Sequence, residues 1–165
     1  MNAISGFLRF PQFDMRRFAL LVGTLILSGC LNLNVDSPEE HPSDPRTETF
    51  DASLHVDLST MQQTAGGVYY KDLRVGTGDT LKAQQSIVVN YAAFVKTGAR
   101  FGQGTGTLLP LPQTILGFQD GVKGMIVGGE RQLVIPSALG YGSSTNAPVP
   151  PNSTLIFDVV LVSIP

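Results

Sequence analysis

Aromatic side chains punctuate two stretches of the sequence that carry no charge. Residues 101–119 and residues 132–157 contain no Asp, Glu, Lys or Arg. The aromatic residues that stand out in them are Phe101, Phe118, Tyr141 and Phe157. Exposed loops normally carry charges, so long uncharged stretches rich in Gly, Pro, Ser and Thr indicate loops around an apolar cleft. Such clefts, with a few polar groups, are the usual sites for small ligands and peptides.

The chemistry open to such a cleft is narrow. These stretches contain no cysteine and no histidine, and the carboxylates of Asp120 and Asp158 are isolated in the sequence. Covalent and acid–base catalysis are therefore poorly supported. Rotation about an X–Pro peptide bond needs neither, because its barrier of about 18–20 kcal/mol comes from amide resonance. An apolar site with one or two hydrogen-bond donors favours the twisted amide, which is preferential binding of the transition state.

Residues 115–125, ILGFQDGVKGM, are expected to form a helix beside this cleft. The apolar residues recur at steps of three and four, which is helical spacing: Ile115, Phe118, Val122 and Met125. Three glycines occupy the same turns, although each costs a helix roughly 0.5–1 kcal/mol relative to alanine: Gly117, Gly121 and Gly124. This spacing predicts a bare stripe that lets the helix press into a curled sheet. Ile115 and Phe118 then line the opening, or they are ordinary core.

Strands are predicted for most of the remaining globular part. The candidate strands are residues 68–75, 86–95, 130–136 and 153–164, with a hairpin turn at 96–99 leading into a returning strand at 100–101. The chain has 18 glycines and 11 prolines among 165 residues, with 15% charged residues, which suits a turn-rich domain. One helix among several strands with short connections predicts an antiparallel α+β sheet.

The N-terminal region is predicted to be a secretory signal peptide, residues 1–29. A basic MRR segment from Met15 precedes the apolar FALLVGTLIL and then LSGC, which ends at Cys30. This ending resembles the bacterial lipobox, which implies lipidation of Cys30. An uncleaved transmembrane anchor is the alternative, but the apolar run is shorter than the ~20 residues that a span needs. Met15 is a candidate for the true start of translation.

Residues 30–65 are expected to be the lipidated N-terminus and a flexible acidic tether. Seven of the thirteen acidic residues fall between Asp36 and Asp57, against one arginine. Such composition favours disorder. Alternation of Leu54, Val56 and Leu58 suggests a short strand or extended arm within it. The expected location is the cell envelope, held by the lipid anchor, on the periplasmic face of the outer membrane if the organism has two membranes. Residues 66–165 are then the globular domain.

Several function classes are disfavoured by composition. The net charge of −2 gives no basic footprint for nucleic acid. His41 and His55 lie in a polar stretch without a nearby cysteine, so a metal site is not expected. The single cysteine excludes an internal disulfide.

Three ordered blocks resemble the FKBP-type peptidyl-prolyl isomerases, which bind macrolides. The blocks are VVNYAAFVKTGARF (88–101), ILGFQDGVKGMIVGGERQLVIPSALGYG (115–142) and VPPNSTLIFDVVLVSI (149–164). The resemblance spans about residues 67–164. It implies an α+β fold in which a five-stranded antiparallel sheet wraps around one short helix. It also implies isomerisation of X–Pro bonds, without a cofactor or metal, in the folding of extracytoplasmic proteins.

The resemblance assigns an aromatic lining to the cleft. Tyr91 and Phe101 form one wall, Phe118 is the floor, and Phe157 closes the back. Plain core packing is the alternative role for Tyr91 and Phe157. The expected partners are proline-containing polypeptides, macrolide inhibitors and, through the lipid anchor, a membrane.

The polar contacts follow from the same matching positions. Ile115 offers its backbone N–H to the substrate carbonyl, with Thr114 beside it. Tyr141 donates its hydroxyl near the carbonyl of the proline, and Val149 caps the site from its loop. The sequence departs from the family at Gly102, where an aspartate usually follows the wall phenylalanine. A proline-peptide-binding chaperone module with little turnover is therefore the alternative function.

Overall fold

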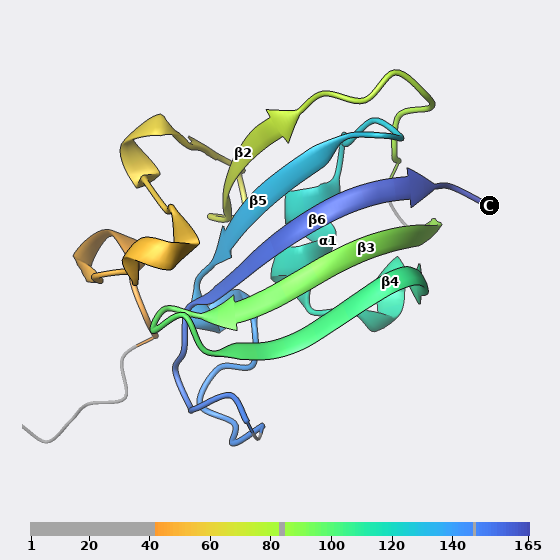
Figure 1. Ribbon diagram of the computed structural model, residues 1–165. Coiled ribbons are helices and arrows are strands. Elements are labelled where there is room, and N and C mark those ends of the chain that lie inside the picture. The colour runs from red at the N-terminus through yellow and green to blue at the C-terminus, as the bar shows by residue number, and fades with distance from the viewer. Residues whose placement is uncertain (1–41, 83–84, 147) are drawn as a thin grey trace, which may run out of the picture. The chain divides into compact units, whose positions relative to one another are not determined.

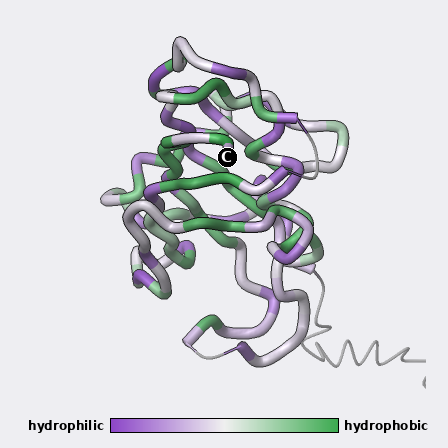
Figure 2. The backbone as a smooth tube through the Cα atoms, turned by 90° about the vertical axis from the view of Figure 1, so that its right-hand side faces the viewer, coloured by the Kyte–Doolittle hydropathy of each residue, from purple (hydrophilic) through white to green (hydrophobic). Residues whose placement is uncertain are grey.

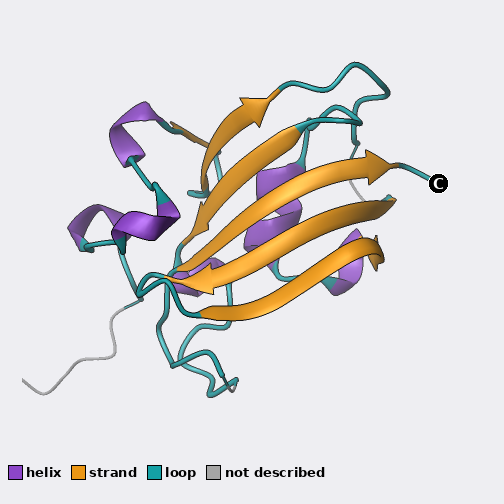
Figure 3. Cartoon of the chain, viewed as in Figure 1, coloured by secondary structure: helices purple, strands orange, loops and turns teal. Residues whose placement is uncertain are grey.

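The computed structural model describes residues 42–82, 85–146 and 148–165. Its core is one antiparallel sheet with the strand order β1-β2-β5-β6-β3-β4 (Figures 1 and 3). The strands are β1 (Gln62–Gln63), β2 (Tyr69–Arg74), β3 (Ser86–Val95), β4 (Arg100–Pro110), β5 (Glu130–Ile135) and β6 (Leu155–Ser163). The predicted α+β class is confirmed. The sheet has six strands instead of five because Gln62 and Gln63 pair with β2.

Short helical elements connect and flank these strands. The α-helix is α1 (Leu116–Val122). Single 3-10 turns are η1 (Pro45–Thr47), η2 (Ala52–Leu54), η3 (Leu58–Thr60), η4 (Leu111–Gln113) and η5 (Ser137–Leu139). No helix in the described ranges is long and apolar enough to cross a membrane.

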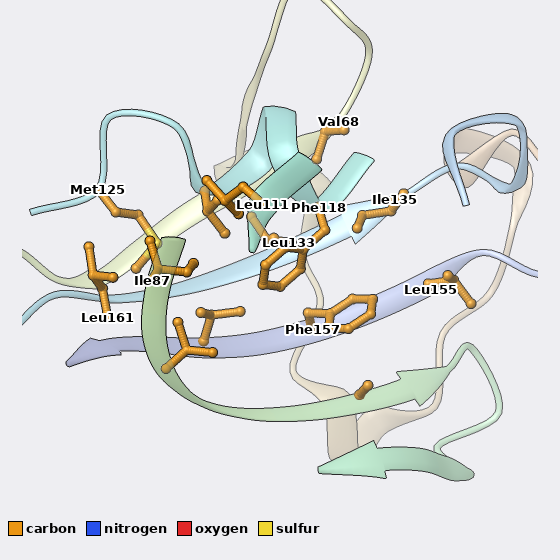
Figure 4. Close-up of a cluster of buried hydrophobic side chains, with 14 of the residues drawn as sticks. Val68, Ile87, Leu111, Phe118, Met125, Leu133, Ile135, Leu155, Phe157 and Leu161 are labelled. Atoms are coloured by element: carbon orange, nitrogen blue, oxygen red, sulfur yellow. The ribbon is translucent and has the colours of Figure 1, made fainter. Parts of the chain in front are cut away.

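The central strands β3 and β6 place alternate side chains on the two faces of the sheet. Val89 and Val159 are fully buried on the inner face, whereas Asn90 and Asp158 point to the other side of these strands. The inner face joins the helix in one apolar core, and hydrophobic residues dominate these strands in Figure 2. Residues such as Leu133, Met125 and Phe157 converge there from different elements (Figure 4).

Helix α1 lies against the inner face, where glycines permit close approach. A Cβ atom on Gly117 would overlap the side chain of Ile135, and one on Gly121 would lie 2.8 Å from a methyl carbon of Leu133. The predicted bare stripe is confirmed at these two positions. It is wrong at Gly124, which follows the helix in open space with φ +77°, a conformation that favours glycine.

Arg131 fixes the C-terminal end of α1 to the sheet. Its Nη1 donates to the carbonyl oxygens of Gly121 (2.9 Å) and Lys123 (3.1 Å), which lack partners within so short a helix. Asp72 accepts from the Nε of the same guanidinium at 2.6 Å and from its Nη2 at 3.0 Å. The guanidinium carbon also lies 4.4 Å from the centre of the Tyr70 ring. This buried arginine therefore holds the helix at a set position over β5.

Residues 42–65 pack on the outer face of the sheet. Leu54 is 6% exposed and joins Tyr69, Val134 and Ile156 in a second apolar cluster. The amide of Gln132, from β5, donates to the Leu54 carbonyl at 2.9 Å. This packing corrects the expected tether over residues 42–65 and the expected domain boundary at residue 66. It also replaces the expected strand or arm at residues 54–58 by the turns η2 and η3.

The acidic composition predicted a flexible, self-repelling tether, but three of the acidic side chains form local hydrogen bonds that stabilise short turns. Asp44, Asp51 and Asp57 each accept a backbone N–H at the start of a 3-10 turn. Such caps satisfy donors that a short turn leaves open. The predicted signal peptide and the Cys30 lipidation site lie outside the described residues.

Candidate functional site

An open cleft of about 350 Å³ lies between the inner face of the sheet and the first turn of α1. None of the described residues that line it is charged. The lining residues are Tyr91, Ala93, Phe101, Gly102, Leu109, Gln113, Thr114, Ile115, Phe118, Tyr141 and Phe157. Seven of the eight predicted site residues of the globular domain are thus brought together.

The aromatic residues reach the cleft from separate elements. Tyr91 comes from β3, Phe101 from β4, Phe157 from β6 and Phe118 from α1. Tyr141 lies in the turn that follows η5. Because β3 pairs with both β4 and β6, three of the rings stand on adjacent strands of one sheet. The rigid sheet therefore sets most of the lining, and α1 and one loop complete it.

Phe157 is the hub of the aromatic lining. Its ring centre lies 5.4 Å from that of Phe118, 5.8 Å from that of Phe101 and 6.5 Å from that of Tyr91. The contacts to Phe118 and Phe101 are edge-to-face, the favoured arrangement of aromatic pairs. Tyr141 stands edge-on to Phe101 at 6.3 Å. These contacts form a walled apolar pocket whose floor is Phe118, which is only 3% exposed (Figure 4 shows Phe118 and Phe157).

The backbone ahead of α1 supplies the polar side of the cleft. Gln119, on α1, donates its side-chain amide to the Thr114 carbonyl at 2.8 Å. The Thr114 hydroxyl donates to the Leu111 carbonyl at 2.8 Å, so both groups hold this corner in place. The Ile115 carbonyl accepts the first N–H bonds of the helix, from Phe118 and Gln119. The Ile115 N–H makes no backbone or side-chain hydrogen bond to another described residue, so it is open to a ligand.

The two tyrosine hydroxyls in the cleft are similarly open. Neither Tyr91 nor Tyr141 makes a side-chain hydrogen bond to another residue of the described ranges. Gly102 lies beside Tyr91, and a Cβ there would be 3.7 Å from the Tyr91 ring. Gly102 thus leaves space, but brings no carboxylate, beside this ring. The cleft offers a ligand neutral donors and apolar surface.

Val149 is placed differently from its predicted role as a cap. Its side chain is 2% exposed and belongs to the inner apolar core, and it is absent from the cleft lining. Its N–H donates to the Asn146 carbonyl at 2.8 Å, which closes a tight turn in the loop. The family resemblance implied a cap over the cleft, whereas the turn directs this residue inward.

Three lining residues were not identified from the sequence: Ala93, Leu109 and Gln113. Ala93 could have been found, because it follows Tyr91 by two positions on a strand and therefore shares its face. Leu109 depends on the pairing of β3 with β4, where it lies opposite Ile87. Gln113 ends the 3-10 turn η4, which no pattern in the sequence marked.

A family model described as FKBP-type peptidyl-prolyl cis-trans isomerase matches residues 78–162, just over half of the chain. The chain belongs to this family. The matched range holds every residue that lines the cleft. The FKBP resemblance inferred from three sequence blocks is thereby confirmed.

Individual relatives agree with the FKBP assignment. The chain is 39% identical over 110 residues to the 46 kDa FK506-binding nuclear protein of Spodoptera frugiperda, which covers 62% of this chain and 27% of that protein. It is 36% identical over 111 residues to the FKBP-type isomerase FkpA of Buchnera aphidicola, which covers 65% and 46%. The chain thus spans less than half the length of these two curated relatives.

Solved structures share the FKBP fold. FkpA from Escherichia coli superposes with a TM-score of 0.60 at 33% identity, over 64% of this chain and 51% of that one. A peptidyl-prolyl isomerase from Pseudomonas syringae pv. tomato gives a TM-score of 0.62 at 26% identity, over 68% and 86%.

Proposed function

We propose that this FKBP-type domain catalyses cis–trans isomerisation of X–Pro peptide bonds. The observation that carries the proposal is the uncharged aromatic cleft, floored by Phe118, with the open N–H of Ile115 and the hydroxyl of Tyr141 among its lining groups. Membership of the isomerase family supports the same reaction. No group in this cleft has to exchange a proton or form a covalent bond for the reaction to proceed.

The geometry suggests how the barrier falls. A proline ring stacks in the aromatic pocket between Phe118, Phe101 and Phe157, and the Ile115 N–H binds the carbonyl that follows the proline. The preceding carbonyl then turns in the apolar part of the cleft. A planar amide is more charge-separated than a twisted one, so removal of water favours the transition state. The Tyr141 hydroxyl, a neutral donor, binds near the carbonyl of the proline itself and holds the peptide while the preceding amide turns.

The proposed substrates are proline-containing segments of unfolded or extended polypeptides. The cleft is open to solvent, so it can receive a proline that stands within a longer polypeptide. Several relatives are named FK506-binding proteins, which supports the further proposal that macrolides of this kind compete for the cleft.

We also propose that the chain acts outside the cytoplasm, held by a lipid on Cys30. The support is the run MRRFALLVGTLILSGC, which has the order of a lipoprotein signal peptide. One acyl chain binds a membrane only marginally, so stable attachment requires more than one. Mass spectrometry of membrane-bound protein tests this proposal. An unmodified Cys30 in that fraction contradicts it.

A protease-free assay on a short prolyl peptide tests the isomerase proposal with the full chain. We expect turnover that FK506 inhibits and for which the Phe118→Ala variant shows a higher KM. The matched control is Leu116→Ala, which changes a 65% exposed leucine on the same helix. Peptide binding and suppression of aggregation without turnover would identify a binding module instead, which is the second function considered from the sequence.

A further inference from the structure

We propose that Ser43 is a positioning residue for Tyr141. Its hydroxyl ties together the two ends of the loop 137–154, which carries this tyrosine. We call this arrangement the Ser43 clasp; it consists of Ser43, Ser137 and Thr154. Its effect on catalysis rests on the proposed isomerase function, whereas its effect on the loop does not.

The clasp is a closed set of three hydrogen bonds. The Ser43 N–H donates to the Ser137 hydroxyl oxygen at 2.8 Å, and the Ser137 N–H donates back to the Ser43 hydroxyl oxygen at 2.9 Å. The Thr154 hydroxyl donates to the same oxygen of Ser43 at 2.8 Å. One oxygen atom therefore accepts from both ends of the loop.

Because the partners of Ser43 are buried, loss of one of these hydrogen bonds should be costly. Ser137 and Thr154 are both fully buried. A buried donor that loses its acceptor bears its full desolvation cost, because water cannot readily replace the missing group. Removal of the Ser43 oxygen would leave the Ser137 N–H and the Thr154 hydroxyl without this acceptor. The loop would relieve this cost by shifting at one of its ends.

Ser137 passes this constraint to the turn that holds Tyr141. Its carbonyl oxygen accepts from the N–H of Gly140 and from the N–H of Gly142, both at 2.9 Å. These two glycines flank Tyr141 in the sequence. The Gly142 carbonyl accepts in turn from the Asn152 N–H at 2.7 Å, which joins the turn to the far side of the loop. The tyrosine thus stands on a backbone frame that is built from Ser137.

The rest of the cleft does not depend on this frame. Phe118 stands on α1, which Arg131 and the packing of Gly121 against Leu133 hold to β5. Phe101 and Phe157 belong to paired strands. Loss of the clasp should therefore displace Tyr141 and spare the part of the pocket that Phe101, Phe118 and Phe157 form. The expected signature is a fall in turnover number with little change in KM.

The test compares Ser43→Ala with the conservative Ser43→Thr, which keeps a hydroxyl. The matched control is Glu48→Gln, which removes the negative charge from the 2.9 Å ion pair with Lys96 and so weakens the same segment's hold on the sheet away from the loop. The readouts are amide exchange at Gly140 and Gly142, the 19F signal of 3-fluorotyrosine at position 141, and kinetics on a prolyl peptide. Each is measured on the full chain.

We expect Ser43→Ala to exchange the Gly140 and Gly142 amides at least tenfold faster while the β3 and β6 amides stay unchanged. The 19F signal should shift, the turnover number should fall three- to tenfold, and Ser43→Thr should restore both. Equal amide exchange at Gly140 and Gly142 in Ser43→Ala and Glu48→Gln would contradict the clasp. A Ser43→Ala variant whose loop amides exchange faster but whose turnover number is unchanged would contradict the positioning role. A native chain without turnover contradicts the isomerase proposal alone, and amide exchange then decides whether the clasp holds the loop.

Discussion

The ring of Phe118 on α1 stands edge-on to the ring of Phe157 on β6, with centres 5.4 Å apart and planes inclined by 64°. This contact joins the helix to the central sheet, and both rings are buried in the lining of the cleft. The two residues lie 39 positions apart in the sequence, one in each of its uncharged stretches. A single pair thus serves both the core and the site.

Phe118→Ala should damage stability and activity together. Truncation of a buried phenylalanine costs about 3–5 kcal/mol because it leaves a cavity. Thermal unfolding should show a lower melting temperature, and prolyl-peptide kinetics should show a higher KM. The exposed Leu116→Ala should change neither, and a stable, fully active Phe118→Ala would remove this residue from the site.

Tyr141→Phe should lower activity without lowering stability. The ring keeps its contact with Phe101, and only the open hydroxyl is lost. One neutral hydrogen bond contributes about 0.5–1.5 kcal/mol, so kcat/KM should fall about two- to tenfold while the melting temperature stays the same. Unfolding of this variant would show that the hydroxyl is a structural tie.

Gly102→Asp should accelerate isomerisation several-fold. Gly102 has no positive φ, and a Cβ there would meet only ordinary contacts, at 3.7 Å, with Ala93 and the Tyr91 ring. A carboxylate would therefore fit beside the Tyr91 ring. Hydrogen bonds to charged groups contribute about 1.5–3 kcal/mol.

The matched control for this gain is Gly102→Ala, which adds the Cβ without the charge. It should keep the native rate and melting temperature. If Gly102→Asp folds normally and turns over no faster than Gly102→Ala, the cleft does not use the missing carboxylate.

Leu54→Ala tests whether residues 42–65 belong to the folded domain. Leu54 packs against Val134 and Ile156, and loss of such a side chain costs about 2–5 kcal/mol. The melting temperature should drop by several degrees. Thr49→Ala, at an exposed position of the same segment, should leave it unchanged. Equal melting curves for the two variants would show that residues 42–65 do not stabilise the domain, as expected of a flexible tether.

Asp158→Asn should stabilise the protein at neutral pH. Burial raises the pKa of the Asp158 carboxyl above its usual value near 3.8, against the opposing hydrogen bond from Gln132. The charge of Glu130 raises the same pKa by a smaller amount, and the charge of His55 lowers it by a smaller amount. A raised native pKa means that the folded chain binds this proton more tightly than the unfolded chain. The resulting stability is complete below the unfolded pKa and is lost as the pH rises through the native one.

The measurement is the melting temperature of native protein and Asp158→Asn from pH 3 to pH 7. The advantage of the variant should be absent at pH 3 and should grow above about pH 4. Asp79→Asn, at an exposed position, is the control and should run parallel to native protein. A difference in melting temperature between the two proteins that stays constant from pH 3 to pH 7 would show that burial of the charged Asp158 carboxylate does not destabilise the fold.

Much of the fold was readable from local patterns. The alternation in β3 and β6 and the spacing of Phe118 and Val122 depend on periods of two and 3.6, which sequence displays directly. The motif blocks then placed most of the aromatic lining. Val149 was misplaced because its burial depends on a turn closed by Asn146, and that turn has no periodic signature.

The packing of residues 42–65 could not be inferred in this way. This segment has no repeating period, and its acids were taken as self-repelling, whereas Asp44, Asp51 and Asp57 cap three short turns. Its apolar partners Val134 and Ile156 lie about 80 to 100 positions later in the chain. Only the tertiary structure shows that two faces of the sheet need covering.

The Ser43 clasp has a consequence for the order of folding. It joins residues that are 94 and 111 positions apart along the chain. Closing such long loops costs chain entropy before any contact compensates for it, and non-local contacts slow folding. During synthesis residues 42–65 emerge from the ribosome before every strand on which they later pack. We therefore expect the part of the described chain that is made first to dock last, and the Tyr141 turn to be the last piece of the cleft to be fixed.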